Sequence, residues 1–463
     1  MKTEKSGDRK RGWCCIVVGG QYGSEGKGKV CQWLQKIVVN PHVVRVGGPN
    51  SGHTVYYRKL KYETPAIERE GKISYNSSLI QELPGPDPSG KYKTDSIALK
   101  QLPACALNLD ANMYLAAGSA VNPKILLEEC KRVEELTGQS IKSRLIIDPR
   151  SVIISDDIRS YEDLLKESIG STGSGTGEAF MSRALRVPGK CVLVGQLEFL
   201  KKVASGEEWE IKKAIPVGLD QLTTLEIFNL AELIKEAGFF EILDYCRVQE
   251  VAPLLHTGYR EAGANIIVEG TQGFGLSIYH GDRWPYVTAR DTTASGFAAE
   301  AGIPPNMVDD VIMVVRSWPI RVGGNSGPFT TDEIDWKEVQ ESCGAPEEEV
   351  ELTSVTKKVR RVAYFDESYI RKAALYNGAT AMVFLGVDRL NHANRNVEGW
   401  EKITQDCKEV IQSLVASSGV GVIALGTGPE MIFGMPGVVQ GLKQKRDDEL
   451  GQVPLDLGGF GEP

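Results

Sequence analysis

The chain of 463 residues is 41% hydrophobic and 25% charged, the balance of an ordinary globular protein. Its formal net charge of −8 argues against a protein that binds duplex nucleic acid, because phosphate contacts need a basic face. No apolar run approaches membrane-spanning length and no signal-peptide core follows the basic first residues, so we expect a soluble, cytoplasmic protein. The nine cysteines include no C-x-x-C pair and are expected to be reduced, mostly buried thiols.

The first predicted element is an apolar strand, Cys14–Val18, which leads into a glycine-rich loop, Gly19–Val30, and then into an amphipathic helix. This order directs backbone N–H groups and a helix N-terminus at phosphate oxygens, and two lysines near the end of the loop add positive charge. The loop departs from the Walker pattern G-x-x-x-x-G-K-[ST], because Gln21 stands at the first glycine and Gly28 at the hydroxyl residue. The alternative is that the loop is only a turn that packs the helix on the sheet and binds no ligand. The two lysines disfavour this alternative. We therefore predict a nucleotide phosphate site of an unusual type.

Short apolar runs alternate with helical patterns along the rest of the chain, which is typical of βαβ units and a mainly parallel sheet. The predicted strands are His42–Val46, Arg144–Asp148, Cys191–Val194, Asn265–Val268, Val311–Val315, Ala381–Leu385 and Val420–Leu425. The predicted helices include Pro123–Leu136, Gln221–Ala237, Phe365–Tyr376 and Trp400–Leu414. Helical spacing predicts that the second of these helices turns an apolar face to the core, formed by Leu222, Leu225, Ile227, Phe228, Leu230 and Leu233.

These elements predict one large α/β domain over residues 13–433, with insertions. A basic arm of residues 1–12 precedes it, and a tail of residues 434–463, rich in glycine, proline and charge, follows it. Residues 57–102 are polar and contain a proline- and glycine-rich run, so we expect a surface insertion with a hairpin or long loop.

Further loops carry residues suited to binding or catalysis. In Gly47–Thr54 a histidine lies among glycines and small polar residues after a strand, where a substrate can approach closely; the alternative is a simple exposed turn. Gly170–Gly177 alternates glycines with hydroxyl residues, which fits either a flexible linker or a phosphate cradle. Glu269–Gly273 ends a strand, where open α/β sheets bind ligands. Two other strands end at Asp388 and at Gly426–Pro429, and the basic run Thr353–Arg361 is suited either to a dicarboxylate or to a solvated face.

Taken in this order, these stretches resemble the motifs of the adenylosuccinate synthetase family. The matching motifs are the loop Gly-Gln-x-Gly-x-Glu-Gly-Lys-Gly-Lys, Asn50-x-Gly52-His53-Thr54, Thr172-Gly173, Glu269-Gly270-x-Gln272-Gly273 and Thr356 through Arg361. The resemblance implies a large, mostly parallel sheet flanked by helices, a fold related to that of P-loop NTPases, and a homodimer in which an arginine crosses the interface. It also implies a carbon–nitrogen ligase with two steps. A nucleoside triphosphate phosphorylates O6 of a 6-oxopurine nucleotide, and the amine of L-aspartate then displaces that phosphate at C6.

The resemblance further implies roles for individual residues. Lys27 and His53 act in catalysis together with Ser24, and Mg²⁺ is held by the phosphates with Ser24 and Gly52. The donor nucleotide contacts Gly23, Ser24, Glu25, Gly26, Lys27, Gly28, Gly52, His53, Thr54, Asp388, Gly428 and Pro429. The acceptor nucleotide contacts Ser24, Asn50, Ser171, Thr172, Gln272 and Thr288, with Arg183 or Arg186 crossing from the partner subunit. L-Aspartate contacts Ser354, Val355, Thr356, Lys358 and Arg360.

Position 24 departs from the family pattern, because the family's Gly-Asp-Glu-Gly reads Gly23-Ser24-Glu25-Gly26. The missing aspartate ordinarily takes the N1 proton and ligates magnesium, whereas serine is no general base near neutral pH unless another base activates it. The substitution resembles the PurZ branch of the family, from bacteriophages with 2-aminoadenine DNA and their relatives, which uses dGMP in place of IMP. A short neutral side chain leaves room for the C2 amine of guanine and accepts a hydrogen bond from it.

Two further departures concern the ribose and the donor base. Lys358 stands where the family has an arginine near the ribose 2′-hydroxyl, which is compatible with a deoxyribose. Gly386 stands where the family has a lysine that covers the guanine of GTP, which favours ATP or dATP. Asp388 is retained, however, and a carboxylate favours guanine. The sequence leaves the donor base open.

The leading hypothesis is a PurZ-like ligase that condenses dGMP with L-aspartate, driven by ATP or dATP. The runner-up is an ordinary adenylosuccinate synthetase that uses IMP and GTP with a repositioned base. A third hypothesis, from a different class, is an inactive homologue that only binds nucleotides, which the retention of Lys27 and His53 disfavours. The expected partners are these small molecules and a second copy of the chain, with no nucleic acid and no membrane. Two candidates remain for the group that removes the N1 proton, the transferring phosphate and a bound water.

Overall fold

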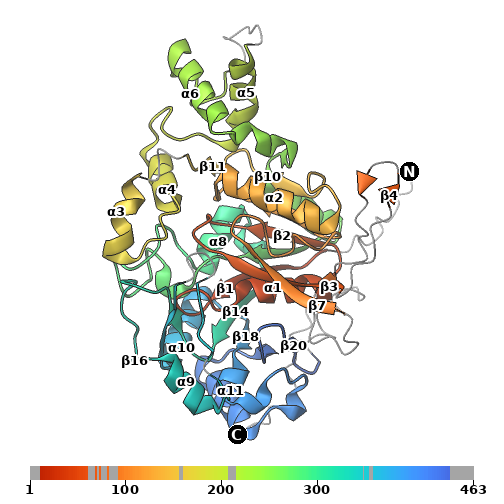
Figure 1. The fold of residues 1–463 in the computed structure, drawn as a ribbon, viewed down its shortest axis with the longest axis vertical. Helices are drawn as coiled ribbons and strands as arrows, with labels where there is room; N and C mark the ends of the chain where they lie inside the picture. The colour runs from red at the N-terminus through yellow and green to blue at the C-terminus, as the bar shows by residue number, and fades with distance from the viewer. Residues whose placement is uncertain are drawn as a thin grey trace, which may run out of the picture.

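The computed structural model describes residues 11–60, 68–69, 72–73, 81–82, 92–155, 160–206, 215–347, 349–353 and 358–437. A ten-stranded sheet flanked by helices lies at its centre (Figure 1). In spatial order the strands are β12 (Arg247–Val248), β10 (Leu145–Ile147), β8 (Asn112–Leu115), β2 (Pro41–Arg45), β13 (Asn265–Glu269), β1 (Cys14–Gly19), β14 (Asp310–Arg316), β18 (Ala381–Leu385), β19 (Val422–Gly426) and β20 (Ile432–Gly434). Neighbouring strands run parallel except β19 and β20, which are antiparallel. The predicted fold, a large and mostly parallel sheet flanked by helices, is confirmed.

The central strands are apolar along their whole length because helices cover both faces of a parallel sheet. Every residue of β1 is buried, and the same holds for β18 and β19. In the parallel register Val17 of β1 lies opposite Glu269 of β13, and Gly19 lies opposite Val314 of β14. The carboxyl ends of these strands therefore meet at one edge of the sheet, where ligands of open α/β sheets bind.

Several helices connect strands of the main sheet. The helix bounds are α1 (Lys27–Ile37), α2 (Pro123–Thr137), α3 (Ser160–Ile169), α4 (Thr176–Leu185), α5 (Leu197–Ser205), α6 (Thr224–Glu236), α7 (Val251–Glu261), α8 (Ala294–Ala301), α9 (Trp336–Cys343), α10 (Glu367–Asn377) and α11 (Gln405–Ser418). Of these, α3, α4, α5 and α6 follow one another in the described residues without a strand between them. Local sequence sets several of the helix limits. The side chain of Asn122 accepts a hydrogen bond from the N–H of Ile125 before Pro123 starts α2, and Gly138 ends that helix in the left-handed conformation.

Smaller β-elements surround the main sheet. The strands β3 (His53–Leu60) and β7 (Tyr92–Leu99) pair antiparallel along their full length, so the ends of segment 57–102 belong to a hairpin with β6 (Gln81–Glu82) at its side. The other pairs are β4 (Glu68–Arg69) with β5 (Lys72–Ile73), β9 (Ala120–Val121) with β11 (Val152–Ile153), and β17 (Arg361–Ala363) with β15 (Ile320–Arg321) and β16 (Glu333–Ile334). The rest of the connection between β3 and β7, residues 1–10 and residues 438–463 lie outside the described part.

The predicted strand Cys191–Val194 is wrong. Within the described residues, Leu193 makes only an isolated bridge to Val152, and Val194–Gln196 is a short 3-10 helix. The reason is local, because the side-chain oxygen of Gln196 accepts a hydrogen bond from the N–H of Leu193 at 3.0 Å and closes a turn. The other predicted strands and three of the four predicted helices are confirmed to within a few residues at each end. The helix predicted over Trp400–Leu414 begins only at Gln405, because Trp400–Lys402 forms a separate 3-10 turn.

The predicted core face of α6 is only partly correct. Ile227 is buried, but Leu225, Phe228 and Leu233 are 68%, 48% and 42% exposed. Figure 1 shows why, since α6 lies beside α5 at one end of the molecule, away from the sheet. Its packed neighbours are α5 and the short 3-10 helix Phe239–Asp244, and a helix covered on so little of its surface buries a narrower stripe than its sequence period suggests.

The nine cysteines all lie in described residues and form no disulfide, and eight of them are buried. Burial raises the pKa of the Cys246 thiol to about 12, so this thiol is inert at neutral pH. No helix in the part of the chain that the structure describes has both the length and the apolar character to span a bilayer.

Candidate active site

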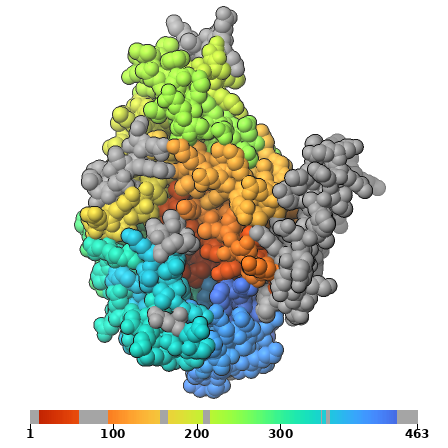
Figure 2. All heavy atoms as spheres, in the orientation of Figure 1, coloured from red at the N-terminus to blue at the C-terminus, as the bar shows by residue number. Residues whose placement is uncertain are grey.

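A cavity of about 1150 Å³ opens at the carboxyl edge of the sheet. In Figure 2 the red atoms of the N-terminal segment lie at the bottom of a hollow between the orange and blue parts of the surface. The loops after β1, β2, β13, β14, β18 and β19 all contribute to its lining, as do α3 and the start of α4. The cavity brings together most of the site residues predicted from the sequence, namely Gly23, Ser24, Glu25, Gly26, Lys27, Gly28, Asn50, Gly52, His53, Thr54, Ser171, Thr172, Gln272, Thr288, Lys358, Arg360, Asp388, Gly428 and Pro429.

The loop between β1 and α1 is held by the buried carboxylate of Glu25. This carboxylate accepts hydrogen bonds from the N–H of Gly23 at 2.7 Å and of Gln21 at 3.1 Å, and from the Nζ of Lys27 at 2.5 Å. Gly26 caps α1 in the left-handed conformation, with no side chain bonded to the first-turn N–H groups. These N–H groups and Lys27 make the start of α1 suited to an anion, as the sequence predicts.

Gly28 allows the start of α1 to approach His53. A Cβ atom at position 28 would lie 2.5 Å from the Cβ of His53, closer than real side chains come. We expect Gly28→Ala to push His53 away from the loop, to destabilise the fold by about 1–3 kcal/mol and to reduce turnover. Thermal denaturation and steady-state kinetics of the purified variant measure both effects, and an unchanged Tm with unchanged turnover would contradict this packing.

Ser24 is exposed to the cavity in a conformation that is uncommon for a residue other than glycine. Its φ is 59°, and no hydrogen bond to its hydroxyl is found among the described residues. Its carbonyl accepts a hydrogen bond from Nη1 of Arg316 at 3.2 Å, and Arg316 is itself ion-paired with Glu351. Arg316 was not predicted as a site residue. It ends the apolar strand β14 at the carboxyl edge, which is the same signal that identified Asp388.

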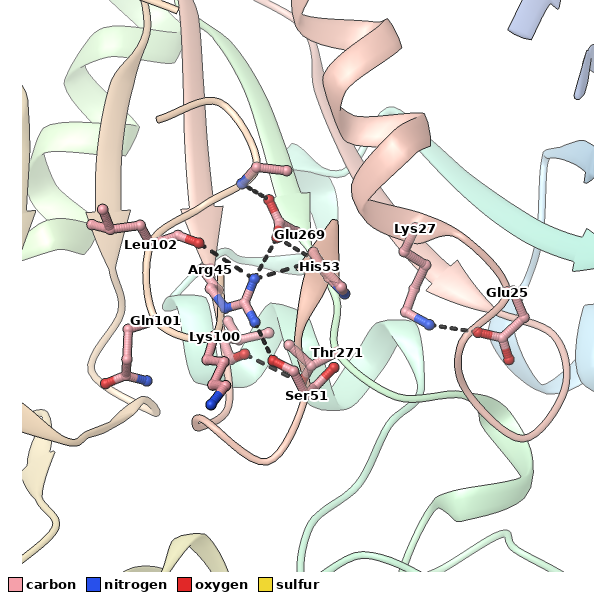
Figure 3. Close-up of polar contacts among 12 residues, drawn as sticks. Glu25, Lys27, Arg45, Ser51, His53, Lys100, Gln101, Leu102, Glu269 and Thr271 are labelled. Carbon is pink, nitrogen blue, oxygen red and sulfur yellow. Dashed lines mark hydrogen bonds and ion pairs between the residues drawn. The ribbon is translucent and has the colours of Figure 1, made fainter. Parts of the chain in front are cut away.

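His53 is fixed by a buried cluster at the base of the cavity (Figure 3). Its Nδ1 lies 2.5 Å from Oε1 of Glu269, which also accepts a hydrogen bond from Nη1 of Arg45 at 2.7 Å. The other oxygen of Glu269 accepts from the N–H of Ala104 at 2.7 Å. With Nδ1 bound to a carboxylate, the proton of a neutral His53 resides on Nδ1, and Nε2 is left for a ligand.

Opposing charges act on His53 in this cluster. Burial lowers the pKa of His53, the neighbouring cation Arg45 lowers it further, and Glu269 opposes both. Burial alone would raise the pKa of Glu269, but the contacts with His53 and Arg45 outweigh it, so that its pKa is lowered and it stays ionised. Sequence reasoning identified the strand end at Glu269 but missed Arg45, because it placed this residue within a strand His42–Val46, whereas β2 ends at Arg45.

Two amide side chains lie at the cavity with buried oxygens for which the described residues provide no hydrogen-bond partner. They are Oδ1 of Asn50 and Oε1 of Gln272, and the φ of Gln272 is 66°. The amide nitrogen of Asn50 is 3.4 Å from the hydroxyl of Thr288. A buried acceptor without a partner destabilises a folded protein by about 1–3 kcal/mol. Both amides therefore indicate that a polar ligand binds at the end of the cavity lined by Asn50, Gln272 and Thr288.

Some predicted site residues lie elsewhere. Arg183 and Arg186 do not line the cavity of their own chain, and Nη1 of Arg183 donates to the carbonyl of Ala117 at 2.7 Å. Three of the five predicted aspartate-binding residues, Ser354, Val355 and Thr356, lie outside the described residues. Arg360 lines the cavity while its Nε donates to the carbonyl of Leu352 at 3.0 Å.

The far end of the cavity lies beyond β18 and β19. Gly386 has a φ of 81°, and a Cβ there would lie 2.7 Å from the hydroxyl oxygen of Ser317, so a longer residue does not fit without a shift. The carboxylate of Asp388 follows and is ion-paired with Arg395 at 2.5 Å. The Nζ of Lys29 donates to the carbonyl of Gly428 at 2.5 Å, which ties this end to α1.

The predicted Mg²⁺ ligands offer hard oxygens but few charges. The hydroxyl of Ser24 and the backbone of Gly52 line the cavity, and the described residues contain no group of three acidic, histidine or cysteine side chains suited to a metal. Mg²⁺ keeps several waters and commonly binds through substrate phosphates with few protein ligands. The residues therefore fit a magnesium ion carried by a nucleotide, with Ser24 and Gly52 as its protein contacts.

Comparison with known proteins places the chain in a family. The family model described as adenylosuccinate synthetase matches residues 16–70 and 91–395. The adenylosuccinate synthetases of Methanocaldococcus jannaschii and Thermococcus sibiricus are 35% and 31% identical to the chain; both alignments span 90% of it, and 95% and 96% of those proteins respectively.

Two solved structures share the fold. One is the succinoaminodeoxyadenylate synthetase (PurZ) of cyanophage S-2L, bound to dGMP and to dATP as energy donor, with a TM-score of 0.62 and 22% identity over 94% of this chain and 99% of the other. The other is the fully ligated adenylosuccinate synthetase of Plasmodium falciparum, with a TM-score of 0.68 and 19% identity over 91% of this chain and 100% of the other. With its fold, its loop motifs and these relatives, the chain belongs to the adenylosuccinate synthetase family of carbon–nitrogen ligases.

Proposed function

We propose that this ligase condenses dGMP with L-aspartate, using ATP or dATP, to give 2-amino-2′-deoxy-N6-succinyladenylate, a precursor of 2-aminoadenine nucleotides. The observation that carries the proposal is the side chain at position 24. Serine stands where the family has an aspartate, and it faces the cavity with no hydrogen bond to its hydroxyl among the described residues. A neutral hydroxyl there leaves space beside N1 of the purine and accepts a hydrogen bond from the C2 amine of guanine.

The acceptor nucleotide is proposed to bind between the loop at Ser24 and the amides of Asn50 and Gln272. Their buried oxygens, which lack partners in the described structure, would accept from donor groups of the nucleotide. The hydroxyls of Ser171, Thr172 and Thr288 line the same end. Arg183 or Arg186 is proposed to reach the site of a second copy of the chain.

The donor triphosphate is proposed to lie against the first turn of α1. There the glycine backbone and Lys27 offer N–H donors to the phosphates, and Lys27 would exchange its contact with Glu25 for a phosphate oxygen. When bound, Mg²⁺ would neutralise phosphate charge. When protonated on Nε2, His53 would donate a hydrogen bond to the leaving diphosphate, and Glu269, which holds Nδ1, would stabilise this imidazolium.

L-Aspartate is proposed to enter on the side of Lys358 and Arg360, whose positive charges suit its carboxylates. The loop around Ser354, Val355 and Thr356 is proposed to complete that site. No step requires Ser24 to act as a base, because the transferring phosphate or a bound water next to N1 can take the proton.

An ordinary synthetase that acts on IMP is the second candidate. It is favoured by the names of the curated relatives, which are adenylosuccinate synthetases at up to 35% identity. The cluster of Arg45, His53 and Glu269 is intact, which disfavours an inactive nucleotide-binding homologue. A protein that only binds nucleotides does not need these buried charges to act on a leaving group.

A phosphate-release assay separates these functions. The purified protein is supplied with aspartate, Mg²⁺ and either ATP or GTP, and with dGMP, GMP or IMP as acceptor. We expect the highest kcat/KM with dGMP and ATP, with the succinylated product identified by mass spectrometry. Turnover with IMP but not with dGMP would contradict the proposal. Nucleotide binding without turnover for any combination of acceptor and donor would support the inactive homologue.

A further inference from the structure

Arg316 joins two segments of the cavity wall that carry proposed site residues. It ends β14 at the carboxyl edge of the sheet and lines the cavity, with a side chain that is 11% exposed. Its Nη1 donates to the carbonyl of Ser24 at 3.2 Å and to Oε2 of Glu351 at 3.1 Å, and its Nη2 donates to Oε1 of Glu351. The guanidinium therefore binds one carboxylate with both of its amino groups, a geometry that adds strength and directional specificity to an ion pair. It contacts the first loop at the same time.

The backbone of Arg316 is held by that first loop as well. The side-chain amide of Gln21 donates to the carbonyl of Arg316 at 3.0 Å and accepts from its N–H at 3.1 Å. Gln21 is buried, with 2% of its surface exposed. Arg316 is thus fixed before any ligand binds, at its backbone by Gln21 and at the end of its side chain by Glu351.

Ser24 depends on this contact more than its neighbours in the loop do. Its left-handed backbone, with a φ of 59°, is unfavourable for a residue other than glycine. The buried carboxylate of Glu25 holds the N–H of Gly23, whereas no hydrogen bond of Ser24 other than the one from Arg316 is found within the described residues. The contact with Arg316 therefore fixes where the Ser24 peptide lies, and with it the direction in which the hydroxyl points.

Glu351 belongs to the part of the chain that carries the two cations proposed for L-aspartate. Segments 351–353 and 358–360 pair antiparallel, and the carbonyl of Glu351 accepts from the N–H of Arg360 at 2.9 Å. The carbonyl of Lys358 accepts from the N–H of Thr353 at 2.8 Å. Burial alone would raise the pKa of Glu351, but Arg316 and Arg360 outweigh it, so that its pKa is lowered and it stays ionised. One guanidinium therefore connects Ser24 to the paired segments 351–353 and 358–360.

We propose that Arg316 is a positioning residue for the acceptor purine: it holds the carbonyl of Ser24 so that the Ser24 hydroxyl faces the purine, and Glu351 holds Arg316 in place. The proposal deepens the function proposed above and rests on its placement of Ser24 beside the purine. Arg316 acts through Ser24 and needs no contact of its own with the base. Removing the guanidinium and removing the hydroxyl should therefore impair the same interaction.

The test is a double-mutant cycle between Arg316→Met and Ser24→Ala in the full chain. Values of kcat/KM for dGMP and for IMP are measured at saturating L-aspartate, so that weaker binding of aspartate does not enter the result. We expect each single variant to lose about tenfold in kcat/KM for dGMP, with a smaller loss for IMP. The double variant should also lose about tenfold, and not about 100-fold, because both changes remove the same contact.

Hydrogen exchange of the substrate-free protein, measured by mass spectrometry, tests the contact without any acceptor. Arg316→Met should raise the exchange rate of the peptide that contains Ser24 several-fold, because the loop then opens more easily. Glu351→Gln removes the charge that fixes Arg316 and should change the exchange rate and the use of dGMP in the same direction. If Arg316→Met does not fold, Glu351→Gln takes its place in both measurements.

Arg144→Met is the matched control. Arg144 is buried and its guanidinium donates to the carbonyls of Ala106, Asn108 and Ala111, but it does not line the cavity. Its loss should lower the Tm and leave two quantities unchanged, the ratio of dGMP to IMP use and the exchange rate of the Ser24 peptide.

Losses that multiply to about 100-fold in the double variant would overturn the role of Arg316. An equal loss with dGMP and IMP in Arg316→Met, or unchanged exchange of the Ser24 peptide in the variants of Arg316 and Glu351, would do the same. The acceptor is judged independently. Turnover of the unaltered protein with IMP but not with dGMP would reject the proposed acceptor, while the exchange of the Ser24 peptide still reports whether Arg316 holds the loop.

Discussion

Replacing Ser24 with aspartate is expected to reduce kcat/KM for dGMP by about 10²-fold or more, because the carboxylate would fill the space proposed for the C2 amine and displace it. The backbone should tolerate the change. Ser24 has a φ of 59°, in a region where aspartate is several-fold enriched among residues other than glycine. The side chain is exposed and its hydroxyl makes no hydrogen bond within the described residues, so little packing is lost. A loss of dGMP turnover would therefore report on the substrate and not on folding.

Ser24→Ala distinguishes the space that position 24 leaves for the C2 amine from the hydrogen bond that the Ser24 hydroxyl would accept from it. Alanine leaves the space open but removes the acceptor, and we expect dGMP use to fall by about tenfold, the effect of one lost hydrogen bond of about 1.4 kcal/mol. IMP use should fall less than dGMP use in this variant, because hypoxanthine has no C2 amine and its turnover loses only the contact of the Ser24 hydroxyl with Mg²⁺. Steady-state kinetics with both acceptors and a thermal melt of each variant complete the measurement. Unchanged dGMP turnover in Ser24→Asp would show that position 24 does not contact the purine.

The sequence predicted the sheet and the cavity well because both depend on local signals. Fully buried parallel strands such as Ala381–Leu385 are short apolar runs, and polar residues within a few positions after them, such as Asp388, lie at the shared carboxyl edge. The prediction was wrong where a single side chain overrides the pattern, as Gln196 does by closing a turn on Leu193. It was also wrong where exposure depends on how many elements pack together, as for Phe228 on α6.

The contacts around the site residues were beyond sequence reasoning for a different reason. Arg395 reaches Asp388 from seven residues away, and its second partner, Glu349, comes from a separate segment. Arg45 and Glu269 meet because β2 and β13 are neighbours in the sheet, with these two residues in direct register. Such pairs are set by strand order and register, which no local pattern in one sequence specifies. The family motifs predicted which residues gather at the cavity, but not which of them hold one another in place.

The second large effect is expected from Glu269→Gln, which keeps the shape of the side chain but removes its charge. Glu269 holds Nδ1 of His53 and neutralises Arg45, so the variant leaves a buried cation close to the histidine: Nη1 of Arg45 lies 3.2 Å from Nδ1. A protonated His53 would lose its counter-charge, and we expect kcat to fall by about 10²-fold or more. KM for the nucleotides should change little, because Glu269 lies beneath His53 and does not line the cavity.

The pH profile should move in a definite direction. The charged groups facing His53 are Glu269, Arg45 and Lys27, of which only the first raises its pKa. Removing the Glu269 carboxylate lowers the pKa of His53 further. When the pH is raised, His53 in the variant therefore loses its proton at a lower pH than in the unaltered protein. The alkaline limb of kcat should accordingly shift to lower pH in Glu269→Gln. Arg45→Met removes a cation instead, and the same limb should shift to higher pH.

A double variant distinguishes positioning from general loss of structure. Breaking a buried ion pair by removing one partner costs about 3–5 kcal/mol, whereas removing both charges is far less destabilising. Arg45→Met combined with Glu269→Gln should therefore recover most of the Tm lost in Glu269→Gln alone. It should not recover kcat, because the carboxylate that stabilises the imidazolium is still absent. Recovery of kcat together with Tm would mean that the cluster acts only on stability, and that His53 needs no charged partner to assist the leaving diphosphate.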